Sequence, residues 1–155
     1  MTTTLLSVLI VEDLPDDAEM LVSLLAQAGL TCAWQRVETA EDFARHLDPP
    51  PDLIFTDFEL PAFSARVALC LLKDRDLDVP CIVVAGTGGA DEAVACMRAG
   101  AADFLHKDRL DRFGQAVRQV RCIRCTHIEL VVCLPREKAI AAHGSTPNDG
   151  LCAAW

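Results

Sequence analysis

The chain has 155 residues, of which 52% are hydrophobic and 24% charged, and its formal net charge is −9. This length and hydrophobic content suit one globular domain with its own core, and they exclude a disordered chain. The acidic balance argues against nucleic acid as a general partner, and without an apolar run near ~20 residues or a signal-peptide pattern we expect no membrane contact and a cytoplasmic location.

The first unit of the chain is an apolar run followed by a segment with helical spacing. Residues 5–11 are nearly all apolar and run into Glu12 and Asp13, which is typical of a strand covered on both faces. Pro15 suits the first turn of a helix, and Gly29 suits its C-terminal cap. A strand that ends on two acids, followed by a helix, is therefore predicted.

The next units repeat this order. A weaker strand covers residues 31–37, and Thr39, with an acid three residues later, predicts the start of a helix. Three prolines from Pro49 onward end that helix. Residues 52–56 form the third apolar strand and deliver Asp57 at its end.

The second half predicts three more helices and two more strands. Ser64 is expected to cap a helix whose inward residues are Val67, Ala68, Leu71 and Leu72. Residues 81–85 form an apolar strand that runs into the glycine-rich loop 86–89. The remaining elements are a helix with Ala90, Val94 and Met97, a short strand over 102–106 that ends at Lys107, and a helix with Leu110, Phe113, Val117 and Val120.

This alternation predicts an α/β fold, a doubly wound (βα)5 domain with a five-stranded parallel sheet of the flavodoxin-like kind. In such sheets ligands bind beyond the carboxyl ends of the strands. Glu12, Asp13, Asp57, Gly86 and Lys107 all fall at those ends. Three carboxylates gathered there would repel one another unless a cation lies between them, which indicates a divalent metal and a phosphoryl group.

Three of these residues also have an ordinary explanation. Glu12 and Asp13 could simply favour the start of the next helix, since acids suit helix N-termini. Lys107 could be a surface lysine. Their joint placement at the ends of separate predicted strands favours a common site over these separate explanations.

The chain contains eight cysteines. Four lie within apolar runs, where we expect small buried hydrophobic residues: Cys32, Cys70, Cys81 and Cys96. Cys122 and Cys125 have metal-ligand spacing, with Cys133 nearby, but no second such pair follows. Structural zinc is therefore the less favoured interpretation, and the role of these three cysteines stays open.

The end of the chain differs from the rest. Residues 107–124 carry six basic residues against Asp108 and Asp111, a stripe that is either a solvated helix face or a contact for an acidic partner or a second copy. We expect one domain over residues 1–125. Residues 126–155 break the pattern and form a C-terminal extension too short for an output domain, and one hypothesis is that they are a truncated or frame-altered remnant.

The set of Glu12 and Asp13, Asp57 followed by Pro61, and Lys107 resembles the receiver domain of two-component response regulators, over about residues 5–123. The resemblance implies a signalling module, not an enzyme, in which Asp57 accepts a phosphoryl group from a sensor histidine kinase or a phosphotransfer protein. It would then signal by contact with a downstream protein target, or as a homodimer through its last two helices.

The resemblance also implies the other roles at the site. Mg²⁺ would be held by Glu12, Asp13, Asp57 and the backbone carbonyl of Glu59. Lys107 and Gly86 would bind the phosphoryl oxygens. A few carboxylates with water are the ligands that Mg²⁺ prefers, and an ammonium neutralises charge during phosphoryl transfer.

The chain departs from the family at two positions. Ala85 stands where members usually carry Ser or Thr, so a hydroxyl that donates to the phosphoryl group is missing, although Thr87 follows two residues later. Phe104 matches the aromatic switch position, whose usual partner is that hydroxyl. Asp108 replaces a proline that usually follows a cis bond, and we expect a trans bond because a non-proline cis bond costs about 2.5–4 kcal/mol.

Three other functions compete with a phosphorylation-controlled receiver. Ala85 favours a receiver-like interaction module with a weak or absent phospho-switch. An aspartyl phosphatase of the haloacid dehalogenase type would need a second aspartate where Glu59 stands. A flavin carrier would need a phosphate-cradling run of Thr, Ser and Gly after the first strand, where acids stand here.

Overall fold

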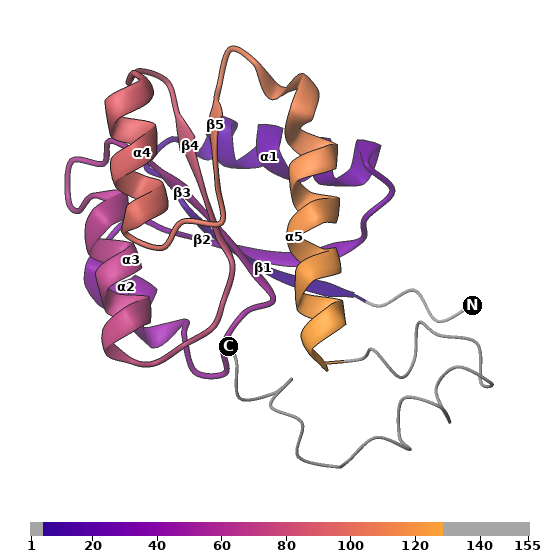
Figure 1. Cartoon of the computed structure of the whole chain (residues 1–155), viewed down its shortest axis with the longest axis horizontal. Helices are drawn as coiled ribbons and strands as arrows, with labels where there is room; N and C mark the ends of the chain where they lie inside the picture. The colour runs from indigo at the N-terminus through magenta and orange to yellow at the C-terminus, as the bar shows by residue number, and fades with distance from the viewer. Residues whose placement is uncertain (1–4, 129–155) are drawn as a thin grey trace. The chain divides into compact units, whose positions relative to one another are not determined.

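A parallel sheet with strand order β2-β1-β3-β4-β5 organises residues 5–128, the part of the chain that the computed structural model describes, with side chains described as far as Arg121 (Figure 1). The strands are β1 (Leu6–Val11), β2 (Cys32–Val37), β3 (Leu53–Asp57), β4 (Cys81–Ala85) and β5 (Asp103–His106). The helical elements are α1 (Pro15–Gln27), α2 (Ala40–Arg45), α3 (Ala65–Asp74), α4 (Ala90–Arg98), the short 3₁₀ turn η1 (Leu110–Arg112) and α5 (Phe113–Ile128).

The order of the elements confirms the predicted (βα)5 fold. The chain runs from β1 outward to the edge strand β2, and then returns to the other side of β1 to form β3. The strand order therefore reverses between β1 and β3, which is where open α/β sheets bind their ligands. Glu12, Asp13 and Asp57 lie at this reversal point, at the carboxyl ends of the two central strands.

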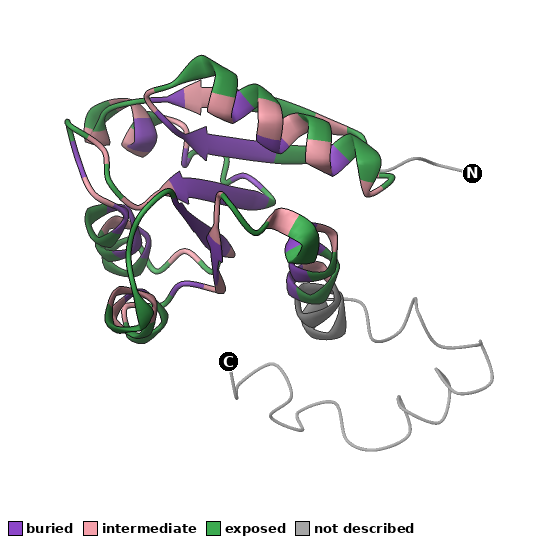
Figure 2. Cartoon of the chain, turned by 90° about the horizontal axis from the view of Figure 1, so that it is seen from above, coloured by how far each residue is buried: buried purple, intermediate pink, exposed green. Residues whose placement is uncertain are grey.

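Helices cover both faces of the sheet. One face packs a core of strand residues such as Val11, Ile54 and Val83 against α2, α3 and α4. Alternate strand residues point to the opposite face, where α1 lies and where the Phe113 ring at the start of α5 stacks on Phe55 with centroids 5.3 Å apart. The central strands are thus buried on both sides, as their continuous apolar runs predict (Figure 2).

The helix ends follow the signals in the sequence. Pro15 is the first residue of α1, and Gly29 beyond its end has a φ of +79°, in the left-handed region that favours glycine. At the start of α2, the Thr39 hydroxyl accepts a hydrogen bond from the backbone N–H of Asp42 at 3.2 Å. The start of α1, the turn after it and the start of α2 therefore lie where the sequence predicts them.

Two predictions about which side chains face inward are wrong in part. In α3, Val67 is 43% exposed, and Leu69 lies in the core with Ala68 and Leu72. The apolar spacing of this short helix allows two overlapping faces, and the packing selects one of them. Among the four cysteines expected to be buried, Cys81 and Cys96 are buried, whereas Cys70 is exposed and Cys32 is only partly buried.

The region after β5 is less regular than its sequence suggests. η1 takes Leu110–Arg112, so α5 begins at Phe113. The predicted domain boundary after residue 125 falls inside α5 and stays a prediction. The side chains of Cys122 and Cys125, Cys133 and the whole extension from residue 129 lie outside the described residues.

Two further expectations concern the backbone and the membrane. Within the described residues the one cis peptide bond is Asp48–Pro49, so the Lys107–Asp108 bond is trans, as expected. Among the same residues, none of the helices has the length and apolar character needed to cross a membrane.

The core predicts a large contrast between Phe43 and Val67. Phe43 is fully buried and its ring packs on Phe63 with centroids 5.8 Å apart, so Phe43→Ala should lower the free energy of unfolding by about 3–5 kcal/mol. Val67→Ala, on the exposed side of α3, should change it by about 0.5 kcal/mol or less. Denaturant unfolding of both variants checks this, and equal losses would contradict the assigned face of α3.

Candidate functional site

An ammonium group joins the ends of three separate elements. Lys107 directly follows β5, and its backbone N–H donates to the carbonyl of Ala85 at 2.8 Å, which fixes its place beside the end of β4. Its Nζ lies 2.9 Å from Glu12 Oε2 and 3.0 Å from Asp57 Oδ2. Three residues predicted from the sequence therefore meet directly at the carboxyl edge of the sheet.

The ammonium has a third partner that the sequence analysis missed. Asp17 Oδ2, in the first turn of α1, lies 2.6 Å from Lys107 Nζ. The acids at the start of α1 gave a signal, because a helix that follows β1 begins at the same edge of the sheet as the site. That signal was weak, since acids at a helix N-terminus are common for other reasons.

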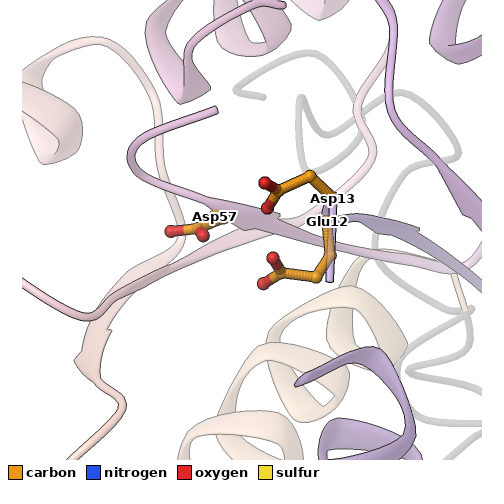
Figure 3. Close-up of side chains that lie close together, drawn as sticks. All are labelled: Glu12, Asp13 and Asp57. Atoms are coloured by element: carbon orange, nitrogen blue, oxygen red, sulfur yellow. The ribbon is translucent and has the colours of Figure 1, made fainter. Parts of the chain in front are cut away.

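Three carboxylates form a cluster beside this lysine. Oxygen atoms of Glu12, Asp13 and Asp57 all lie within 4.8 Å of one another, and Figure 3 shows their side chains gathered from the ends of two strands. Mg²⁺ binds oxygen at about 2.0–2.1 Å, so two of its ligands lie about 3–4 Å apart. Small movements would bring the three side chains onto one ion, and hard carboxylate oxygens are the donors that Mg²⁺ prefers.

Burial makes the charges at this site strongly interdependent. Glu12 is 1% exposed, and burial raises its pKa to about 7, although its hydrogen bond with Lys107 opposes the shift and the neighbouring Asp13 and Asp57 add to it. Burial acts to lower the pKa of Lys107, but its hydrogen bonds with Asp17, Glu12 and Asp57 outweigh it and hold that pKa above its usual value. Lys107 therefore stays charged, and Glu12 titrates near neutral pH.

A second residue that the sequence analysis missed donates hydrogen bonds to the backbone of Glu12 and Asp13. Arg36 is on the edge strand β2, and its Nη1 donates to the carbonyl oxygens of Glu12 at 3.0 Å and Asp13 at 3.3 Å. It also forms an ion pair with Glu38. The guanidinium thus holds the backbone of the acidic pair, and nothing in the local sequence around Arg36 indicates this long-range contact.

A small pocket opens beside Asp57. It has a volume of about 120 Å³ and is lined by Asp57, Phe58, Glu59, Gly86, Thr87 and Lys107. The backbone N–H of Glu59 donates to Asp57 Oδ1 at 3.4 Å. The role of the Glu59 carbonyl as a metal ligand stays a prediction. The pocket has room for a small anion next to the Asp57 carboxylate and the Lys107 ammonium.

The residues predicted to bind the phosphoryl group at β4 or to take part in the conformational switch form two groups near this pocket. Gly86 and Thr87 line it directly. Ala85 is fully buried at the end of β4, and Phe104 is mostly buried in β5, where its ring packs edge-on against Phe58 at 6.0 Å and His106 at 5.4 Å. Phe104 therefore already faces inward, and it packs on Phe58, which lines the pocket.

Comparisons with known proteins agree with this geometry. The family model of the response regulator receiver domain matches residues 8–118. The C4-dicarboxylate transport transcriptional regulatory protein DctD of Pseudomonas aeruginosa is 35% identical over 105 residues, a match that covers 64% of this chain and 21% of DctD. This chain therefore corresponds to about a fifth of that relative.

Solved structures show the same fold. The signal receiver domain of a LuxO repressor protein from Vibrio parahaemolyticus is 27% identical, with a TM-score of 0.70, and the match covers 84% of this chain and 99% of that domain. The receiver domain of the histidine kinase CKI1 from Arabidopsis thaliana, solved with Mg²⁺ and BeF3−, is 21% identical with a TM-score of 0.60. That match covers 76% of this chain and 90% of the other, and at this identity it shows a shared fold alone.

The raised pKa of Glu12 predicts a pH dependence of stability in the metal-free chain. The folded state binds this proton more tightly than the unfolded state, so the cost of charging Glu12 is present above a pH of about 7 and is relieved as the pH falls toward 4.5. Relative to Glu12→Gln, the unmodified chain should therefore lose up to about 3 kcal/mol of stability as the pH rises through this range.

Denaturant unfolding in a chelating buffer over this range of pH measures the difference. Glu19→Gln, which removes an exposed acid from α1, is the matched control and should leave the pH dependence unchanged. A parallel pH profile for the unmodified chain and Glu12→Gln would show that Glu12 does not titrate in this way.

Proposed function

Because the chain belongs to the response regulator receiver family, we propose that Asp57 accepts a phosphoryl group from a phosphohistidine on a sensor histidine kinase or a phosphotransfer protein. In this reaction an Asp57 carboxylate oxygen forms a bond to phosphorus, the bond between phosphorus and the imidazole nitrogen breaks, and the imidazole leaves. The observation that carries the proposal is the Lys107 ammonium 3.0 Å from Asp57 Oδ2 beside a pocket that a small anion can enter.

The residues around Asp57 have separate tasks in this proposal. Glu12, Asp13 and Asp57 would hold Mg²⁺, with the Glu59 carbonyl as a further ligand, and the ion would supply positive charge beside the phosphoryl oxygens. Lys107 supplies a second positive charge beside Asp57 and, with the backbone of Gly86, would bind the transferred group. Arg36 keeps the backbone of the acidic pair in place.

The signal would leave the domain by protein contact. A downstream protein target, or a second copy of this chain bound through α4 and α5, would recognise the phosphorylated form. Val94 and Met97 of α4 are both exposed, at 48% and 46%, and offer apolar contact area for such a partner. We place this exchange in the cytoplasm, where kinases and phosphotransfer proteins act.

One observation favours a second candidate, a receiver-like interaction module with a weak phospho-switch. Ala85 has no hydroxyl, so one charge-assisted hydrogen bond to the phosphoryl group, worth about 1.5–3 kcal/mol, is missing. Phe104 already packs inward on Phe58 and His106. Phosphorylation would then have less rearrangement left to drive.

Phosphorylation is tested directly with acetyl phosphate and Mg²⁺, followed by the intact mass of the chain. We expect a single phosphoryl adduct, because Asp57 is the one of the three carboxylates paired with the ammonium that lines the pocket. Asp57→Asn should abolish the adduct, whereas Asp74→Asn, which changes an exposed aspartate of α3, should retain it. An adduct that persists in Asp57→Asn would contradict the assigned acceptor.

The strength of the conformational switch is tested by introducing a hydroxyl at residue 85. Ala85→Ser should increase the spectral change in α4 and β5 on binding of beryllofluoride with Mg²⁺, since a serine there can donate to the phosphoryl mimic. Backbone NMR shifts before and after addition give the measurement, and the double variant Ala85→Ser with Asp57→Asn is the control without a phosphoryl site. Identical changes with and without the hydroxyl would show that Ala85 does not limit the switch.

A further inference from the structure

The hydrogen bonds of Lys107 are fully used before any phosphoryl group arrives. A lysine ammonium has three N–H donors, and the three carboxylates of Glu12, Asp17 and Asp57 each lie within 3.0 Å of Nζ. The Asp17 contact, at 2.6 Å, is the shortest of them. A phosphoryl oxygen that is to receive a bond from Lys107 must therefore replace one of these partners.

Asp17 differs from the other two partners in place and surroundings. It belongs to α1, not to a strand end, and its side chain is 29% exposed, against 2% for Glu12 and 11% for Asp57. It also lies outside the cluster of Glu12, Asp13 and Asp57 that offers oxygens to a cation. Asp17 therefore attracts the ammonium without contributing to the metal cluster.

We propose that Asp17 is a positioning residue that shares the Lys107 ammonium with the metal-binding acids and restrains its movement toward the phosphoryl group. The proposal rests on the function proposed above for Asp57 and deepens it. Asp17 touches neither the phosphoryl group nor the metal in this role. It acts through Lys107, by competing for that residue's N–H donors and charge.

The competition has opposite consequences for the two ligands of the site. Without the Asp17 charge, Lys107 would donate to Glu12 and Asp57 alone, and would compete more strongly with Mg²⁺ for the same oxygens. With Mg²⁺ bound and a phosphoryl mimic on Asp57, nothing would draw the ammonium back toward α1, so the mimic would gain a stronger partner. Loss of the Asp17 charge should therefore weaken metal binding and strengthen binding of the mimic.

The experiment compares the full chain with Asp17→Asn and with Asp16→Asn. Asp16 is the exposed neighbour of Asp17 in the first turn of α1. Its substitution therefore removes the same charge from an adjacent position. Each protein is titrated first with Mg²⁺ alone and then with beryllofluoride at saturating Mg²⁺, with backbone amide shifts as the readout. Asp17→Ser is a second variant that removes the charge with a shorter side chain.

For Asp17→Asn and Asp17→Ser we expect about two- to fivefold weaker Mg²⁺ binding and about two- to fivefold tighter beryllofluoride binding, the range of one partly exposed ion pair. Asp16→Asn should stay close to the unmodified chain in both titrations. The opposite signs are the signature, because a variant that merely loosens the fold would weaken both ligands together.

The outcomes separate this inference from the function on which it rests. Asp17 variants that lose affinity for both ligands, or that match Asp16→Asn, would overturn the role of Asp17 while beryllofluoride binding to the unmodified chain, lost in Asp57→Asn, still supported the phosphoryl site. Failure of the unmodified chain to bind beryllofluoride would overturn the proposed function, and the role of Asp17 with it.

Discussion

The contact between one ammonium and three carboxylates is the interaction on which the site depends. Glu12 is almost completely buried, and a buried carboxylate is tolerated only when a partner compensates for its lost hydration. Lys107 supplies that partner from a segment 95 residues away. Because the same Nζ also contacts Asp17 and Asp57, it fixes the ends of β1, β3 and β5 and the start of α1 in one place.

The charges at this site do not balance within the protein. Glu12, Asp17 and Asp57 surround a single ammonium, and Asp13 lies beside Glu12 and Asp57, while the nearby guanidinium of Arg36 is directed at the backbone carbonyls and at Glu38. An excess of negative charge in a partly buried place favours a cation. The fold therefore gathers more carboxylates than its own cations balance, an arrangement that suits the divalent ion of the function proposed above.

Much of this arrangement could be predicted from the sequence because strand ends are visible there. Apolar runs that stop at Glu12, Asp57 and Lys107, separated by helical segments, define a parallel sheet whose carboxyl edge must collect those residues. Asp17 and Arg36 could not be assigned in this way. Their contacts depend on how far a side chain reaches across the folded molecule, and Asp17 meets a lysine 90 positions later.

The errors about burial have a similar origin. Apolar spacing shows that α3 is amphipathic, but in a helix of 10 residues it leaves the direction of the apolar face uncertain by about one position. The packing against β3 and the neighbouring helices decides that Leu69 and not Val67 enters the core. A cysteine in an apolar run says even less about burial, because this small side chain is tolerated both in the core, as at Cys81, and on the surface, as at Cys70.

The raised pKa of Glu12 connects these observations to the behaviour of the site. In the function proposed above, a proton, the Lys107 ammonium and a metal ion would bind the same carboxylate oxygens, and because burial raises the pKa of Glu12 to about 7 the proton competes near neutral pH. Each of the three lowers the negative charge that the other two respond to, so binding of any one weakens the hold of the others. In that proposal a competition among cations sets the charge of the acidic cluster, in which burial of Glu12 favours binding of the proton and the contacts of Lys107 with Glu12 and Asp57 favour the ammonium.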